Sequence, residues 1–221
     1  AANAIAAFEI EAFTLLHSPW QRYLNGDETA LSPAAKAGAL LFFDDAGCSR
    51  CHSGPLFTDQ MAHNLAVPQV GPGKGEEAPL DYGRFRETGI PADKFAFRTP
   101  PLHNVAITGP WMHNGAFSDL RAVIAHHLNP AESLRGYDTA VHLPPALQNT
   151  FQNNPALLDE MLSGVDPLLA PTRSLTQAEI SHLVAFLQAL TDPAAVDMSR
   201  FVPATVPSGL PVDGIPLPTA N

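Results

Sequence analysis

Cysteine is scarce in this chain, with two residues in 221, Cys48 and Cys51. So few cysteines exclude a disulfide-rich scaffold, in which several bridges hold a small fold together. They also leave a structural zinc site incomplete, because zinc usually takes four ligands and two histidines would have to come from elsewhere. The two cysteines therefore act as a pair.

Positive charge and long apolar runs are also lacking. Lys and Arg number 12 against 22 Asp and Glu, which gives a formal net charge of −10. This charge argues against binding to nucleic acid or to anionic membrane surfaces. No run of about 18 apolar residues occurs, so we expect no membrane-spanning segment. The chain begins at Ala1 without the basic region of a signal peptide, so we expect a processed product whose beginning has been removed.

Proline, by contrast, is abundant. The chain holds 22 prolines, about twice the usual share. Apolar residues make up 45% of the sequence, which excludes a disordered chain of low hydrophobicity. The composition predicts a mainly α-helical fold in which short helices are joined by long ordered loops. Residues 53–117 have no sustained periodicity, and a stretch of that length inside a compact domain is expected to wrap something.

Apolar periodicity and capping signals predict the helices. The expected ranges are 2–17, 33–44, 119–128, 156–163 and 177–190. The first carries an apolar stripe of Ile5, Phe8, Ile10, Phe13 and Leu16, and Ser18-Pro19-Trp20 is expected to end it. Ser32 and Ser118 are expected caps of the second and third helices, and Thr176 with Glu179 forms a capping box for the last.

Two of these helices are expected to cross. Gly38 in helix 33–44 would allow helix 177–190 to approach closely. Phe42 is then expected to pack near Phe186 or Leu187. Burial of such side chains contributes about 1.5–3 kcal/mol each.

The stretch Cys48-Ser49-Arg50-Cys51-His52 has three chemical interpretations: half of a zinc site, a redox-active pair, or a haem attachment site. Zinc has no second cysteine pair here, and a thioredoxin-like pair would lie in an alternating strand–helix pattern that this chain does not offer. The C-x-x-C-H spacing is typical of c-type haem, with two thioether bonds and an axial histidine. We therefore predict one covalent haem c on Cys48 and Cys51, with His52 as the proximal iron ligand. Covalent attachment of this kind occurs outside the cytoplasm, so we expect a periplasmic or otherwise exported protein.

The second axial position of the iron has several candidate ligands, since Met or a second His is usual in electron-transfer haems. The candidates are Met61, His63, Met112, His113, His126 and His127. His127 shares the apolar face of its helix with Val123 and Leu120, whereas His126 points about 100° away. An inward-facing histidine among aliphatic side chains needs a partner, so His127 is favoured.

Four segments together resemble the C-terminal half of the bacterial di-haem cytochrome c peroxidases and their MauG-like relatives. They are GALLFFDDAGCSRCHSGPLFTD, DYGRFRETG, FRTPPLHNVAITGPWMHNGAFSDLRAVIAHHLNP and VPSGLPVD. The resemblance runs from about Ala7 to Asp213 and implies a cytochrome c-like haem domain. We expect an N-terminal helix and lead-in over 1–31, the haem domain over 32–191 and an extended, proline-rich tail over 192–221.

The resemblance also implies roles for individual residues. In the family the distal ligand, Met or Tyr, lies on the helix that carries His127, so a histidine there is a departure. Arg84 and Arg98 match positions that could pair with haem propionates, with a solvated surface arginine as the alternative. Thr108 and Pro110 match a segment whose backbone carbonyls help to hold calcium. His103 stands where the family commonly has Arg.

The sequence has one C-x-x-C-H motif where the family has two. We expect a six-coordinate haem that transfers electrons, as in the relay half of the di-haem peroxidases, with a redox partner protein or a separate peroxidatic haem subunit or domain. One alternative is a peroxidase or oxidase acting at this haem, which would recruit His63, His113 or Glu77. Another is a non-catalytic haem subunit of a larger complex.

Overall fold

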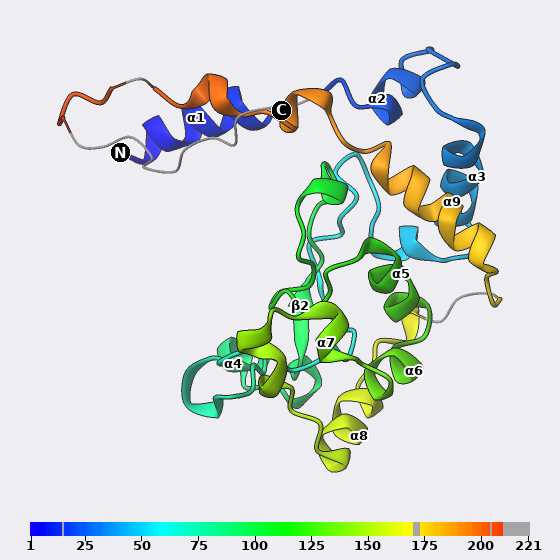
Figure 1. Ribbon diagram of the computed structural model, residues 1–221, viewed down its shortest axis with the longest axis vertical. Helices are drawn as coiled ribbons and strands as arrows, with labels where there is room; N and C mark the ends of the chain where they lie inside the picture. Colours follow the sequence, from blue (N-terminus) through cyan, green and yellow to red (C-terminus); the bar gives the residue numbers. More distant parts are fainter. Residues whose placement is uncertain (15, 170–172, 204, 210–221) are drawn as a thin grey trace.

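The computed structural model describes residues 1–14, 16–169, 173–203 and 205–209 (Figure 1). Helices dominate it, as the composition predicted. The α-helices are α1 (Ala2–Phe13), α2 (Pro19–Leu24), α3 (Pro33–Phe43), α4 (Phe85–Thr88), α5 (Leu120–Leu128), α6 (Pro130–Arg135), α7 (Thr139–His142), α8 (Pro155–Ser163) and α9 (Gln177–Gln188). Short 3₁₀ turns include η1 (Cys48–Arg50), η2 (Gly75–Glu77), η4 (Val105–Ile107) and η5 (Pro145–Thr150).

Helices α3 and α9 lie side by side and form the main core, as predicted (Figure 1). A methyl group at Gly38 would overlap the backbone carbonyl of His182, so the close approach does require glycine. The rings of Phe42 and Phe186 are 5.1 Å apart. Both helix starts are confirmed, since Ser32 accepts a hydrogen bond from the amide of Ala35 and Thr176 forms its capping box.

Helix α5 packs against α9 and completes this core. Leu120 and Ile124 of α5 join the cluster formed by Phe42, Leu183 and Phe186. The predicted cap of this helix is wrong by one residue: Asp119, rather than Ser118, accepts the hydrogen bond from the amide of Ala122. The hydroxyl of Ser118 instead donates to the carbonyl of Val141, at 3.3 Å.

The segment 53–117 contains little regular structure but is held by many local bonds. Strands β1 (Ala62–Asn64) and β2 (Ala96–Arg98) form an antiparallel pair with His63 opposite Phe97. The segment that connects the two strands includes α4. Helices α6 and α8 enclose a second apolar cluster around Leu134 and Met161.

Helix α1 and the C-terminal segment lie beside each other, away from the rest of the molecule (Figure 1). The first helix ends at Phe13, earlier than predicted, and Ser18 begins α2 with a capping box instead of ending α1. The apolar stripe of α1 stays exposed, Ile10 by 68%. Its ring contact to the C-terminal segment joins Phe8 and Phe201, 6.1 Å apart.

The predicted division into 1–31, 32–191 and 192–221 stays a prediction, and residues 210–221 of the expected tail lie outside the described residues. Among the helices that the structure describes, none has the length and apolar character needed to cross a bilayer.

Candidate haem site

The Cys-Cys-His stretch forms a tight turn at the end of α3. Gly47 has a left-handed φ of 68° and starts the 3₁₀ turn η1, a conformation that glycine adopts without steric cost. The amide of His52 donates to the carbonyl of Cys48 at 2.9 Å. The hydroxyl of Ser49 donates to the carbonyl of Phe43 at 3.2 Å, which ties the turn to α3. Cys48, Cys51 and His52 thus lie together in one short turn.

His52 is oriented by the loop that follows it. Its Nδ1 lies 2.9 Å from the carbonyl oxygen of Phe57. Because a carbonyl only accepts, Nδ1 carries the proton and Nε2 keeps its lone pair. Burial, with a smaller contribution from His127, lowers the pKa of His52 to about 4. The imidazole is therefore neutral at pH 7, which is the form that binds a metal.

His127 is oriented in the same way by its own helix. Its Nδ1 lies 2.8 Å from the carbonyl oxygen of Val123, four residues earlier in α5. Burial lowers the pKa of this imidazole below its usual value. His127 therefore also presents a neutral ring whose Nε2 is the metal-binding atom.

The rings of His52 and His127 lie at a distance that suits one metal ion between them. Their ring centroids are 6.5 Å apart. A metal–imidazole bond is about 2.0 Å long, so two rings on opposite sides of one ion have centroids about 6.3 Å apart. Although 74 residues separate His52 from His127 in the sequence, the turn after η1 and helix α5 bring the two side chains together with a spacing that suits one metal ion. The donor set fits haem iron.

Cys48 lies in apolar surroundings, whereas Cys51 lies near the polar side chains of Asp59 and His63. Cys48 packs against the main core around Phe42 and Leu120. Burial raises the pKa of Cys48 to about 12 and that of Cys51 to about 11, with Asp59 and Asp166 adding to the latter shift. Both thiols are thus neutral at pH 7, and the apolar surroundings of Cys48 suit a large apolar group such as a porphyrin.

His126, the neighbour of His127, has no nitrogen left for a metal. Its Nε2 lies 2.8 Å from the carbonyl oxygen of Leu65, and its Nδ1 lies 3.0 Å from the hydroxyl of Ser133. The side chain is completely buried, and burial lowers its pKa to about 3. His126 thus anchors α5 to the loop that contains Leu65, while the ring of His127 lies near that of His52.

No protein-family model matches the chain. It is 31% identical over 184 residues to the methylamine utilization protein MauG of Methylorubrum extorquens, covering 83% of this chain and 42% of that protein. It is 36% identical over 128 residues to the cytochrome-c peroxidase IdrP1 of Pseudomonas sp. (strain SCT), covering 48% of this chain and 34% of the peroxidase. A crystal structure of a MauG-like protein associated with microbial copper homeostasis superposes with a TM-score of 0.60 and 28% identity, covering 84% of this chain and 55% of that one.

The chain is a homologue of the di-haem cytochrome c peroxidases and of MauG. It spans less than half the length of the two curated relatives above. The helix-dominated architecture is the cytochrome-like fold of these MauG-like and peroxidase neighbours. The di-haem peroxidase family implies covalently bound haem c.

His63, a candidate from the sequence both for the distal ligand and for acid–base chemistry, forms a buried clamp that the sequence did not predict. Its Nδ1 lies 2.6 Å from a carboxylate oxygen of Asp166 and its Nε2 lies 2.9 Å from one of Asp59. Burial alone would lower the pKa of His63, but these two hydrogen bonds outweigh it and raise the pKa above its usual value. Asp59 and His63 also lie close to Cys51. The clamp joins the loop after the haem motif, β1 and the segment after α8.

The other candidate ligands are placed elsewhere. The Met61 side chain is 57% exposed, and Met112 packs against a different apolar cluster, around Phe117. The His113 ring stacks on Phe97 with centroids 3.4 Å apart. Among the candidates, His127 is the one whose ring lies against that of His52, with centroids 6.5 Å apart, while His63 lies near enough to contribute to the lowered pKa of His52.

The positions that were carried over from the family lie at the surface. Arg84 pairs with Asp93 at 3.3 Å, and Arg98 donates to the side-chain oxygen of Gln60 at 2.7 Å. Both line one surface pocket of about 270 Å³ beside β2. Their pairing with propionates stays a prediction.

The predicted calcium segment and the departure at His103 are also surface features. Thr108 and Pro110 are exposed, and the Thr108 hydroxyl donates to the carbonyl of Val105 at 3.2 Å. The calcium site stays a prediction. The Nε2 of His103 lies 2.8 Å from the carbonyl oxygen of Pro55, so this ring braces the loop after the haem motif.

Proposed function

We propose that this chain carries one haem c, attached through Cys48 and Cys51, and that it serves as an electron-transfer domain. His52 and His127 are the proposed axial ligands. A haem of this kind supplies a one-electron Fe(III)/Fe(II) couple. The chain would act as the relay part of a peroxidase-like system, in the periplasm or another exported location, with a redox partner or a separate peroxidatic haem subunit.

The observation that carries this proposal is the pair of neutral imidazoles, with ring centroids 6.5 Å apart. Each Nδ1 is fixed by a backbone carbonyl, that of Phe57 or that of Val123. Such outer hydrogen bonds orient metal-binding histidines and select their tautomer. If both histidines hold the haem iron, they would leave it no coordination site for a small reactant.

The alternative peroxidase or oxidase needs an acid–base group free to act beside an open site. The groups considered for that role already have partners: His63 lies between two carboxylates, His113 stacks on Phe97, and Glu77 pairs with Arg86 at 2.6 Å. These contacts favour electron transfer over peroxide chemistry at this position.

The substitution His127→Gly tests the proposal. We expect the ferric absorption and electron paramagnetic resonance spectra to change from low-spin to high-spin, and added imidazole to restore the low-spin form. His17→Gly, a substitution of an exposed histidine, is the matched control and should leave the spectra unchanged. A low-spin spectrum that survives His127→Gly would refute the ligand assignment.

A further inference from the structure

A group of three polar side chains, the clamp described above, lies beside the attachment turn. The Nδ1 of His63 lies 2.6 Å from Asp166, and its Nε2 lies 2.9 Å from Asp59. The exposed fractions of the side chains are 10% for His63, 19% for Asp59 and 23% for Asp166. Charges that are mostly shielded from solvent act more strongly on their neighbours than surface charges do, because water and salt screen them less.

The clamp lies close to one of the two predicted attachment sulfurs. The Sγ of Cys51 and the ligand atoms of Asp59 and His63 lie within 4.8 Å of one another. A thioether at Cys51 would bond this sulfur directly to the porphyrin, so the clamp would lie at the edge of the haem. Both nitrogens of His63 already have carboxylate partners. The clamp would therefore affect the iron through its charge and not as a ligand.

The charges of the clamp act on the groups of the site. Burial raises the pKa of the Cys51 thiol, both carboxylates of the clamp raise it further, and Arg50 in the turn opposes them. Burial is also the main cause of the lowered pKa of His52. Asp59 opposes that shift, whereas His63 adds to it. The carboxylates thus favour positive charge at this site, and His63 disfavours it.

His63 is positively charged at pH 6. Burial opposes this charge, but the hydrogen bonds to the two carboxylates outweigh it and raise the pKa of His63 above 6.5. Burial would also raise the pKa of Asp59, yet hydrogen bonds lower it below 3.8. At pH 6 the clamp therefore holds one imidazolium between two carboxylates.

We propose that His63 is a positioning residue that sets the reduction potential of the haem, because its imidazolium holds two carboxylates beside Cys51 and offsets part of their charge. This inference rests on the proposed function, since it needs a haem attached at Cys51. Reduction adds one electron to the ferric iron. Nearby negative charge therefore favours the ferric form and lowers the potential, while positive charge raises it. Removal of a carboxylate should raise the potential, and removal of the imidazolium should lower it.

The test is a spectroelectrochemical titration of the holoprotein at pH 6, in which the electrode supplies the electron. We expect a higher midpoint potential in Asp166→Asn than in the wild type. We expect a lower one in His63→Gln, whose amide keeps a hydrogen-bond donor but carries no charge. Asp166→Glu keeps the charge and should stay closer to the wild type. The low-spin ferric spectrum should be retained in each variant, because neither residue is a proposed iron ligand.

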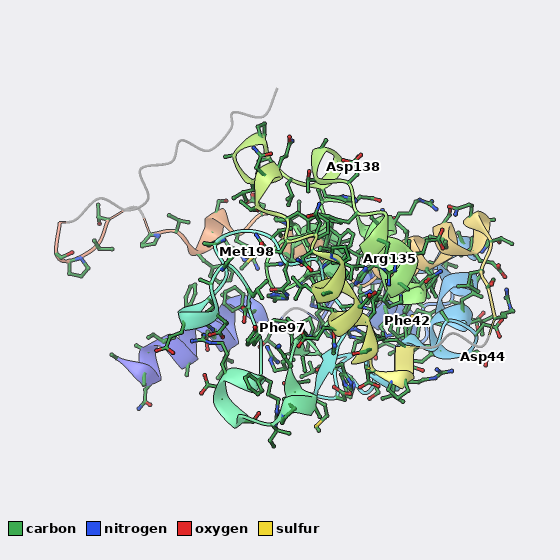
Figure 2. The ribbon with its side chains drawn as sticks, turned by 90° about the horizontal axis from the view of Figure 1, so that it is seen from below. Phe42, Asp44, Phe97, Arg135, Asp138 and Met198 are labelled. Carbon is green, nitrogen blue, oxygen red and sulfur yellow. The ribbon has the colours of Figure 1, made fainter. Side chains whose placement is uncertain are left out.

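The matched control is Asp138→Asn, which removes one negative charge from another part of the chain. Asp138 accepts a hydrogen bond from the amide of Ala140 at the start of α7, a role that asparagine also fills. Figure 2 shows Asp138 at the periphery of the molecule, well away from Phe97, the residue of β2 that lies opposite His63. This variant should leave the midpoint potential unchanged.

The signs of the shifts separate a charge effect from a loss of packing, which would move both potentials in the same direction. The proposal is overturned if Asp166→Asn and His63→Gln do not shift the potential in the stated opposite directions, or if neither shift exceeds that of Asp138→Asn. If His63→Gln does not fold, the comparison of Asp166→Asn with Asp166→Glu decides, and equal potentials in these two variants would overturn the proposal.

Failure of the proposed function gives a different result. A low-spin ferric spectrum that survives His127→Gly would refute the second axial ligand. The opposite shifts of the clamp variants depend on haem attachment at Cys51 and not on His127, so they would still be observed.

Discussion

Helices α3 and α1 have similar compositions but opposite environments. Both are rich in alanine and phenylalanine. Helix α3 buries Phe42 against α9, whereas the stripe of α1 stays in solvent, with Phe8 47% exposed. The two helices differ in the element packed against them, because Gly38 lets α9 approach α3 closely. α1 meets the short segment around Phe201. An apolar helix is thus buried when another element fits its surface, and its composition alone does not decide this.

Removal of the haem is expected to have the largest effect on stability. It would unfold the main core and so remove the difference in environment between α3 and α1. In the double variant Cys48→Ala/Cys51→Ala, covalent attachment is lost, and with it the large apolar group beside the main core. We expect the haem-free chain to be largely unfolded, because the whole stability of a domain is about 5–15 kcal/mol. Far-ultraviolet circular dichroism should show no cooperative melt, in contrast to the wild-type holoprotein. A cooperative melt of the haem-free chain would contradict the prediction.

The helix crossing itself is tested by Gly38→Val. The new side chain would meet the backbone carbonyl of His182, so α3 and α9 would have to separate. Overpacking costs about 1–3 kcal/mol where side chains can adjust, and we expect a loss at or above the upper end because backbone atoms are involved. Ala4→Val in α1 is the control. If the two variants have equal free energies of unfolding in denaturant titrations, the close approach is not essential.

Truncation of one aromatic ring in each region sharpens the comparison. Phe186→Ala removes a fully buried ring that contacts Phe42 and Trp20, and should cost about 3–5 kcal/mol. Phe8→Ala in α1 should cost less than about 1 kcal/mol, as for exposed positions. Guanidinium unfolding curves give both values. Similar losses would show that α1 is as firmly packed as the core.

The smallest expected effect concerns pH and the clamp of His63. The pKa of His63 is raised above 6.5 in the fold, so its contribution is fully present below pH 6.5 and is lost as the pH rises through the raised value. Burial would raise the pKa of Asp59, but hydrogen bonds lower it below 3.8, so its contribution is lost as the pH falls below that value. The loss of stability in His63→Gln should therefore be largest between these limits.

This pH dependence is measured from denaturant midpoints across the range. His17→Gln, on the exposed segment after α1, should show no such dependence. A constant difference between wild type and His63→Gln at all pH values would exclude a charged clamp.

Much of the helical fold could be predicted because its signals are local. Ser32-Pro33 and the capping box at Thr176 fix the starts of α3 and α9 by contacts within three residues. Helices α2, α6 and α7 were not predicted, since four to six residues are too few to show a periodicity. Ser18 was assigned to the end of α1 for the same reason, although it starts α2.

The candidate site was predictable where the helix period governs it. His127 was selected by its face of α5, and its bond to Val123 follows the same four-residue spacing. The other hydrogen bonds that orient the histidines depend on tertiary structure. Phe57 adopts a left-handed φ of 56° to present its carbonyl to His52. Asp166 reaches His63 across 103 residues of sequence. No short sequence pattern predicts these two contacts.

The hydrogen bonds that orient His52 and His127 end on main-chain oxygens, those of Phe57 and Val123. Every amino acid supplies a carbonyl oxygen, so replacement of either side chain leaves the acceptor in place. Insertions and deletions, in contrast, would displace it. The ligand geometry should therefore tolerate sequence drift at Val123. Phe57 is constrained in addition by its burial in the main core and its left-handed φ, and a change of loop length between residues 52 and 57 should displace its carbonyl.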